Sequence, residues 1–212
     1  LFFSNCIVFY SNVIELFLTS ASILTKAFYT LLNGYNYCTG GKHVKFYLTS
    51  GTPDFMERLM NKYPKEPMIL LHGNGNSVVM HESDKKTVFA TPRQFEVIDG
   101  AGQFEQRGFV AMHNVPVMDE SRPLFEEQLI KGIVPLKADP SLIAYRVLRP
   151  IKASIYVVVT QWAGPASFDT WIHSTSFKTT LAPLLDSSGS PTQNLFDSKS
   201  YVTTFTAPQP EE

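Results

Sequence analysis

From residue 44 onwards, the chain alternates between short apolar stretches with strand periodicity and segments with helical spacing. In two places a Thr-Pro pair precedes an amphipathic segment, and this pair is typical of a helix start because Thr caps well and Pro fits the first turn. A Gly-Asn-Gly-Asn run between two apolar stretches is typical of a hairpin turn. The first half therefore predicts a strand at 45–51, a helix from Thr52, a hairpin at 68–83, a short strand at 87–90 and a helix at 91–99.

The second half repeats this order of elements more regularly. It predicts a strand at 108–117, a helix at 121–132, paired strands at 142–151 and 154–163, a helix at 165–185 and a strand at 200–208. The order β-α-β-β-α-β is ferredoxin-like, and such a sheet carries its helices on one face and leaves the other to be covered. We therefore predict an α+β protein whose two ferredoxin-like halves pack sheet to sheet, like a dimeric α/β barrel.

Three segments lie outside these two halves, which we expect to span 44–104 and 105–208. The polar, breaker-rich segment 187–194 predicts a loop, and residues 209–212 predict a frayed tail. Residues 1–43 are strongly apolar, but Asn5, Asn12 and Glu15 interrupt the best window for a membrane span. The first basic residue, Lys26, follows the apolar run, which is the wrong order for a signal peptide.

We expect instead that residues 1–43 are not part of the native protein. The chain begins with Leu, the codons of residues 39–41 could contain a ribosome-binding sequence, and Val44 could be encoded by a GTG start.

Composition removes several classes of function. The formal net charge of −1 offers no broad electrostatic surface for nucleic acid or an anionic membrane. Both cysteines, Cys6 and Cys38, precede Val44. The main body therefore has no disulfide framework, zinc knuckle or cysteine nucleophile, and a reducing cytoplasm is the simplest compartment.

Most polar residues in the predicted elements indicate no chemistry. His72 and His81 flank the hairpin without a carboxylate cluster, so we interpret them as solvent-facing or hydrogen-bonded strand histidines. Arg146 and Arg149 are three residues apart on one strand, so their side chains should point to opposite faces. A surface ion pair is the default expectation for either arginine.

His113 and Trp171 are more informative. His113 shares a strand face with Ala111 and Val115, so it is either a hydrogen-bonded core residue or a pocket residue. Trp171 shares an apolar helical stripe with Phe168, whereas His173 lies about 200° around the helix from it and should face away. The Ser-Thr-Ser run at 174–176 predicts a bend in this helix.

Several motifs resemble one known family, and the likeness extends from Val44 to about residue 207. They are FYLTSGTPDF, ILLHGNGNSVVMHE, KKTVFATPRQFEVID, GFVAMHNVPV followed by RPLFE, YRVLRP, TQW, SFDTW and SYVTTF. The chain resembles the antibiotic biosynthesis monooxygenase (ABM) superfamily, specifically the bacillary heme-degrading monooxygenase B type. It is more distantly similar to the staphylococcal target of RNAIII-activating protein.

The resemblance implies that an ABM domain at 105–208 binds heme and degrades it. In the family, heme is both cofactor and substrate, O2 binds its iron, and an external reductase supplies electrons. The ring is opened and iron is released. An axial histidine, a distal asparagine and a tryptophan that presses on the ring surround the heme.

Carried over by position, the family tryptophan matches Trp171, the asparagine falls on His113 beside Asn114, and the axial histidine falls on Leu181. Leucine cannot ligate iron, whereas imidazole is a common axial ligand. Three outcomes follow: His113 ligates the heme iron with Trp171 against the ring, the site oxidises another aromatic substrate without a metal, or the protein is a non-catalytic binding or signalling module. The resemblance allows a monomer with pseudo-dimeric halves or a homodimer.

Overall fold

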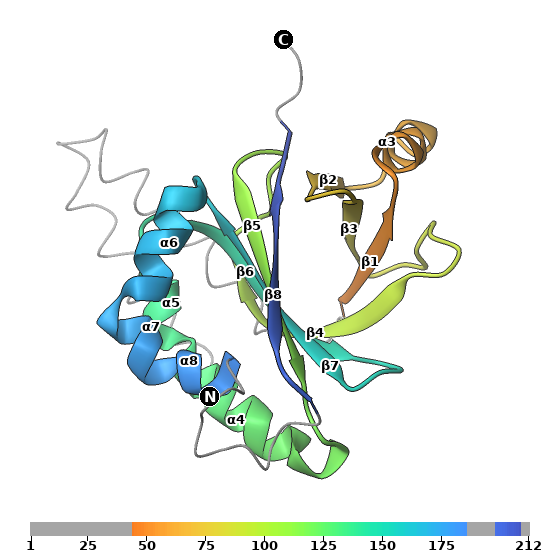
Figure 1. The fold of residues 1–212 in the computed structure, drawn as a ribbon. Helices are drawn as coiled ribbons and strands as arrows, with labels where there is room; N and C mark the ends of the chain where they lie inside the picture. Colours follow the sequence, from red (N-terminus) through yellow and green to blue (C-terminus); the bar gives the residue numbers. More distant parts are fainter. Residues whose placement is uncertain (1–43, 186–197, 209–212) are drawn as a thin grey trace, which may run out of the picture. The chain divides into compact units, whose positions relative to one another are not determined.

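The computed structural model describes residues 44–185 and 198–208, which form an α+β unit around a closed eight-stranded barrel (Figure 1). The order of hydrogen-bonded strands is β1-β3-β2-β8-β5-β7-β6-β4, with β4 returning to β1. The expectations for residues 1–43, for the loop at 187–194 and for the tail at 209–212 lie outside the described residues.

The elements of the described chain have the following bounds. The strands are β1 (Lys45–Gly51), β2 (Met68–His72), β3 (Ser77–Ser83), β4 (Arg93–Ala101), β5 (Phe109–Pro116), β6 (Leu142–Pro150), β7 (Ile155–Trp162) and β8 (Tyr201–Thr206). The helices are α3 (Pro53–Lys62), α4 (Arg122–Gly132), α5 (Val134–Lys137), α6 (Pro165–His173), α7 (Thr175–Thr180) and α8 (Ala182–Leu185), and the 3-10 helix η1 (Asp119–Ser121) precedes α4.

The barrel contains two runs of four antiparallel strands with the same order. The runs are β4-β1-β3-β2 and β8-β5-β7-β6, so each has its strands in the order fourth, first, third, second. One junction between the runs, β4 to β6, is paired along most of its length with a bulge between Val97 and Asp99. The other junction, β2 to β8, is made in the described chain by the single register pair His72–Thr206.

The prediction of a helix at 91–99 is wrong, because this segment forms strand β4. Phe95 and Val97 alternate into the barrel interior, where they pack in the apolar cluster of the barrel. In this position β4 fills the edges of both β1 and β6, which would otherwise carry unpaired backbone groups. The segment 87–90, predicted as a short strand, has no regular structure, and its Phe89 packs in the cluster beneath α3.

The helices lie outside the barrel in two groups (Figure 1). Helix α3 packs on β1, β2 and β3, whereas α6 and α8 pack on the second run of strands at β5 and β7. The apolar core is accordingly divided into a cluster inside the barrel, a cluster under the second group of helices and a smaller cluster under α3. Within the described ranges, no helix combines the length and the apolar character needed to cross a membrane.

Gln106 bridges the weak junction between β2 and β8. Its side-chain amide donates hydrogen bonds to the carbonyl oxygens of Leu70 (2.7 Å) and Pro208 (3.1 Å). The Leu70 N–H in turn donates to Gln106 Oε1 at 2.9 Å. One glutamine side chain therefore replaces the strand pairing that β2 and β8 do not make here.

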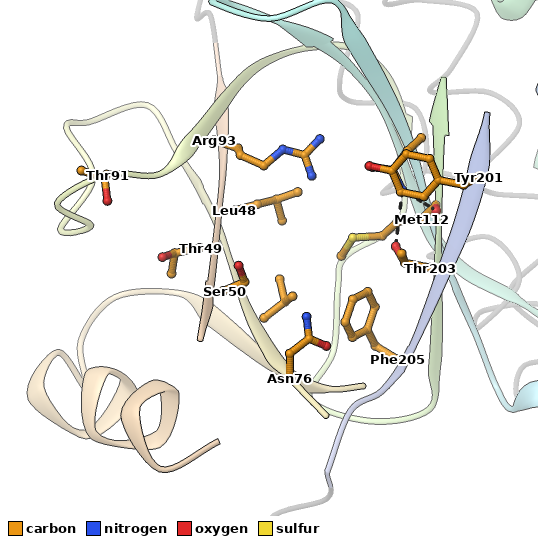
Figure 2. A pocket seen from close by; sticks show the side chains of 12 residues that line it. Leu48, Thr49, Ser50, Asn76, Thr91, Arg93, Met112, Tyr201, Thr203 and Phe205 are labelled. Atoms are coloured by element: carbon orange, nitrogen blue, oxygen red, sulfur yellow. Dashed lines mark hydrogen bonds between the residues drawn. The ribbon is translucent and has the colours of Figure 1, made fainter. Parts of the chain in front are cut away.

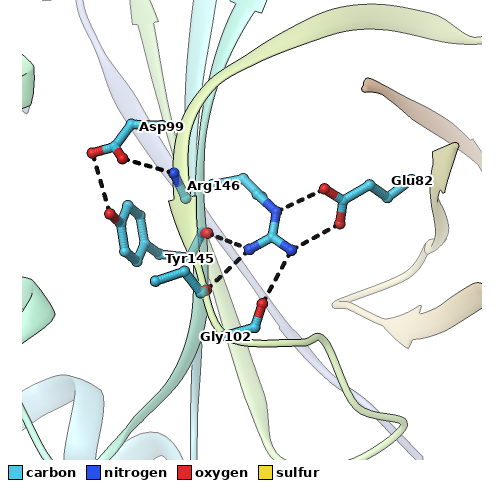
Figure 3. Close-up of polar contacts among 7 residues, drawn as sticks. Glu82, Asp99, Gly102, Tyr145 and Arg146 are labelled. Atoms are coloured by element: carbon cyan, nitrogen blue, oxygen red, sulfur yellow. Dashed lines mark hydrogen bonds and ion pairs between the residues drawn. The ribbon is translucent and has the colours of Figure 1, made fainter. Parts of the chain in front are cut away.

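Arg146 and Arg149 point to opposite faces of β6, as the strand periodicity predicts. Arg149 lies outside the barrel, half exposed, and pairs with Glu126. Arg146 points into the barrel, is 1% exposed, and forms a two-pronged ion pair with Glu82 through Nε (2.8 Å) and Nη2 (2.9 Å), as Figure 3 shows. Its remaining N–H groups donate to backbone carbonyl oxygens, those of Ala101, Gly102 and Tyr145. The expectation of a surface ion pair is therefore wrong for Arg146.

This buried pair gives a prediction about stability. Because Glu82→Gln removes the carboxylate that forms the two-pronged ion pair with the buried guanidinium, we expect the free energy of unfolding to fall by about 3 kcal/mol. The double variant Glu82→Leu/Arg146→Met, which removes both charges, should recover most of this loss. Urea unfolding measures both effects, and Glu127→Gln, in the exposed pair with Lys131, is the matched control expected to leave the midpoint unchanged. A Glu82→Gln midpoint equal to that of the parent protein would contradict the prediction.

Candidate functional site

The candidate site is built on β5, whose two faces look in different directions. Ala111, His113 and Val115 face the helices α4–α8, and Ala111 and Val115 belong to the cluster beneath these helices. Met112 and Asn114 face the barrel interior. The alternation predicted for His113 is therefore confirmed, and the adjacent Asn114 lies on the opposite side of the sheet.

The helix that carries Trp171 breaks where the sequence predicts a bend. Helix α6 ends at His173, and Ser174 adopts an extended backbone conformation (φ −65°, ψ 151°) before α7 begins. The Ser174 hydroxyl accepts a hydrogen bond from the Phe177 N–H at 3.1 Å, so Ser174 is the N-cap of α7. The change of direction brings the Phe177 ring to 4.5 Å from the Trp171 ring, between centroids.

The structure brings His113 and Trp171 together. The His113 ring lies between three aromatic rings of α6 and α7, with centroid distances of 6.1 Å to Phe168, 6.3 Å to Trp171 and 6.2 Å to Phe177. The Trp171 indole meets the imidazole edge-on, at an interplanar angle of 81°. His173 lies on the exposed face of α6, as predicted, with its Nδ1 2.8 Å from the Asp169 carbonyl oxygen.

His113 is a buried, neutral imidazole with an unsatisfied nitrogen. It is 3% exposed, and its Nε2 makes no hydrogen bond with any part of the chain that the structure describes. Burial lowers the pKa of His113 from 6.5 to about 4, because the surroundings are apolar. A buried nitrogen without a hydrogen-bond partner destabilises the folded protein. His113 Nε2 is therefore either a site of reduced stability or a site that a ligand occupies when the protein functions.

The rings around His113 form a closely packed layer. Trp171 is 4% exposed and lies 5.1 Å from the Trp162 ring. Leu181, onto which the resemblance places an axial histidine, is 1% exposed and belongs to the same apolar cluster. A planar ligand beside His113 would therefore occupy space that aromatic side chains fill in this conformation.

Sequence reasoning missed two members of this layer, Trp162 and Phe177. The signal for Trp162 was present, because strand alternation places it on the same face of β7 as Tyr156 and Val158. Its indole N–H donates to Thr160 Oγ1 at 2.9 Å, which satisfies this buried donor. The position of Phe177 depends on the angle between α6 and α7, and side-chain spacing along one helix does not predict that angle.

The two histidines of the first half have structural partners. His72 Nδ1 lies 2.7 Å from Ser77 Oγ. His81 is buried, with Nδ1 3.2 Å from Thr87 Oγ1 and Nε2 3.2 Å from a carboxylate oxygen of Glu66. Among residues 44–185 and 198–208, no three His, Cys, Asp or Glu side chains are grouped as a metal site would require.

Comparisons with known proteins give relatives in sequence that include staphylococcal signal transduction proteins. The chain is 25% identical over 123 residues to the signal transduction protein TRAP of Staphylococcus epidermidis, covering 58% of this chain and 74% of the relative. Its identity to the TRAP protein of Staphylococcus aureus is 25% over 134 residues, covering 63% of this chain and 80% of the relative. No model of a known protein family matches the chain.

Solved structures show the same fold. One described as a major regulator of staphylococcal pathogenesis has a TM-score of 0.71 at 22% identity, covering 78% of this chain and 99% of its own. A ferredoxin-fold protein from Listeria monocytogenes, related to antibiotic biosynthesis monooxygenases, gives 0.65 at 18% identity over 80% and 97% of the two chains. A heme-degrading enzyme from Listeria monocytogenes gives 0.60 at 18% identity over 77% and 99%. The resemblance to the ABM fold is confirmed.

The burial of His113 predicts how stability depends on pH. Because its pKa is about 4 in the folded protein and about 6.5 when unfolded, the unfolded chain binds more protons between these values. Stability is therefore kept above pH 6.5 and lost as the pH falls towards 4. Between pH 7 and pH 4.5, we expect the free energy of unfolding to fall by about 2 kcal/mol less in His113→Leu than in the parent protein.

Urea unfolding at a series of pH values measures this difference. His173→Leu, on the exposed face of α6, is the control and should follow the parent profile. Parallel profiles for the parent protein and His113→Leu would show that His113 takes up its proton as readily in the folded state as in the unfolded chain.

Proposed function

We propose that this protein is a heme-degrading monooxygenase that binds heme between β5 and the helices α6–α8. The observation that carries the proposal is the buried, unpaired Nε2 of His113 beside the Trp171 indole. A neutral imidazole nitrogen is a common axial ligand of heme iron, and flat aromatic side chains are suitable contacts for a porphyrin. The similarity in fold to a heme-degrading enzyme supports the same choice.

The residues present fit heme in their chemistry, but the rings of Trp171 and Phe177 fill the space beside His113, so α6 and α7 would have to shift away from β5 to admit the porphyrin. His113 is neutral at pH 7, so it need not lose a proton before it binds a metal. Trp171, Phe168 and Phe177 form an apolar surround that excludes water from the imidazole. Leu181 supplies packing only, so His113, on the strand side, would be the residue that holds the iron in place of the histidine that the resemblance puts at position 181.

Each side chain then has a defined task. On this proposal His113 Nε2 would hold the iron, Trp171 would pack against the ring, and the remaining aromatic residues would keep bulk water away. When bound, heme supplies both the redox-active iron, which uses O2 and electrons from an external reductase, and the ring that is opened. The protein's own contribution is to bind and orient the ring.

The wider assignments belong to the same proposal. We interpret the two runs of four strands as two ferredoxin-like halves, at 44–104 and 105–208, which do within one chain what two subunits do in dimeric relatives. On this interpretation the first half closes the barrel, the second half carries the ABM domain with the heme site, and the protein acts in the cytoplasm as a monomer with pseudo-dimeric halves or as a homodimer.

A second candidate is a signalling module that does not turn over heme. The observation that favours it is the packing of Trp171 against Phe177 and Trp162, which fills the space beside His113. The substitution of the axial position by Leu181 and the similarity to proteins named for signal transduction agree with it. The two candidates differ in whether heme binds and whether it is then consumed.

A hemin titration of the full chain tests the proposal. We expect a Soret band at micromolar hemin, and His113→Ala should weaken binding at least tenfold because it removes the nitrogen that would hold the iron. Leu181→His, added to His113→Ala, should restore a band, because it places an imidazole at the family's axial position. With a reductant and O2, the Soret band of the parent protein should decay as iron is released.

Several outcomes separate the candidates. His173→Ala is the matched control, and its Soret band should equal that of the parent protein. The absence of a saturable Soret change in the parent protein would contradict the proposal. The remaining candidates would then be the signalling module and a metal-free oxygenase of another aromatic substrate. A Soret band that persists under reductant and O2 would leave heme binding without degradation.

A further inference from the structure

A pocket on the other side of β5 has no role in the heme proposal. It opens at the barrel mouth where β1, β3 and β4 face β5 and β8, with a cavity volume of about 270 Å³ (Figure 2). The apolar part of its wall consists of Leu48, Val78, Met112 and Phe205. The pocket and His113 lie on opposite faces of β5, because Met112 and Asn114 point inward and His113 points outward.

The pocket exists because β8 extends past the end of β2. The two strands meet at His72–Thr206, and β8 from Tyr201 to Phe205 is paired with β5 on its other edge. Likewise, β4 pairs with β1 only as far as the pair Leu48–Arg93. The barrel wall is therefore incomplete beside the pocket, which gives a small molecule a way in.

The polar lining of the pocket is rich in hydroxyl and amide groups and contains one charge. Ser50, Tyr201 and Thr203 contribute hydroxyl groups, and Asn114 donates from Nδ2 to Thr203 Oγ1 at 3.4 Å. Arg93 is the charged member, and none of the lining residues is an Asp or Glu. A wall with hydrogen-bonding groups and a cation but no carboxylate favours an anionic ligand.

Arg93 has no counter-charge in the described chain. Residues 44–185 and 198–208 provide no ion pair or hydrogen bond for its guanidinium, which sits 5.2 Å from the centre of the Phe95 ring. Figure 2 shows the guanidinium directed from β4 across the pocket towards Tyr201. Partial burial lowers the pKa of Arg93, and the nearby Tyr201 opposes this, but an arginine remains cationic at any physiological pH.

We propose that this pocket binds a small carboxylate with an apolar body, through the Arg93 guanidinium and the hydroxyl groups of the wall. The planar guanidinium matches a carboxylate in a two-pronged geometry, and the apolar residues deeper in the barrel accept the rest of the molecule. The volume of about 270 Å³ lies just below the usual range for ligand pockets, which limits the ligand to about the size of an aryl-substituted propionate. This site goes beyond the proposed function, because it uses neither His113 nor Trp171.

Isothermal titration of the full chain with 3-phenylpropionate tests the site. We expect saturable binding in the micromolar to low millimolar range, and a loss of about 10- to 100-fold in Arg93→Gln, because a charge-assisted hydrogen bond is removed. The neutral analogue 3-phenylpropionamide should bind at least tenfold more weakly than the acid. Thr203→Val should weaken binding by a smaller factor, since one neutral hydroxyl group is lost.

The controls distinguish this pocket from a general surface effect. Arg58→Gln changes an exposed arginine on α3, outside the pocket, and should leave 3-phenylpropionate binding unchanged. His113→Ala should also leave it unchanged, so a failure of the heme proposal and a failure of this one have different readouts.

Three results would overturn the proposal. They are no saturable binding of 3-phenylpropionate up to about 10 mM, equal binding of the acid and the amide, and equal binding in Arg93→Gln and the parent protein. Competition by inorganic phosphate at the concentration of the acid would show a simple anion site and would overturn the requirement for an apolar body.

Discussion

Strand β5 is hydrogen-bonded along both edges, to β7 on one side and to β8 on the other, and this pairing fixes the register on which both candidate sites depend. Because side chains alternate along a strand, neighbouring residues point to opposite faces of the sheet and enter different packing environments. His113 enters the aromatic layer beneath the helices, and Asn114 enters the barrel. A shift of one residue would exchange these environments and place an amide among the aromatic rings.

The two junctions that close the barrel around β5 differ in the extent of their strand pairing. The junction of β4 with β6 is a paired ladder, and the Arg146–Glu82 ion pair spans the interior from β6 to β3. The junction of β2 with β8 depends on one register pair and the side chain of Gln106. The barrel mouth is open beside this thinner junction, so access to the interior and local stability have the same structural origin.

Local signals in the sequence predicted the parts of the fold that depend on neighbouring residues. The faces of β5, the break at Ser174 and the outward direction of His173 follow from side-chain period and capping chemistry. The identity of β4 did not, because Thr91 and Pro92 give a helix-start signal that is overruled by hydrogen bonds to β1 and β6, distant in sequence.

The same distinction applies to the candidate sites. Strand and helix periodicity, together with the family resemblance, identified His113 and Trp171 as candidate residues, and the structure places their rings next to each other. The burial of Arg146 and the pocket around Arg93 could not be predicted, because their walls come from strands that meet only when the barrel closes. The unpaired Nε2 of His113 likewise depends on what surrounds it in three dimensions.

The division of β5 into two faces has a consequence for how such a protein can change over evolutionary time. A substitution in the outer aromatic layer, for example at Leu181, alters one compartment while the barrel interior keeps its own packing. A site in the aromatic layer beneath the helices can therefore be lost or altered while a site in the barrel interior is retained. In this architecture, strand β5 separates the two sites, so each can accept substitutions without disturbing the packing of the other.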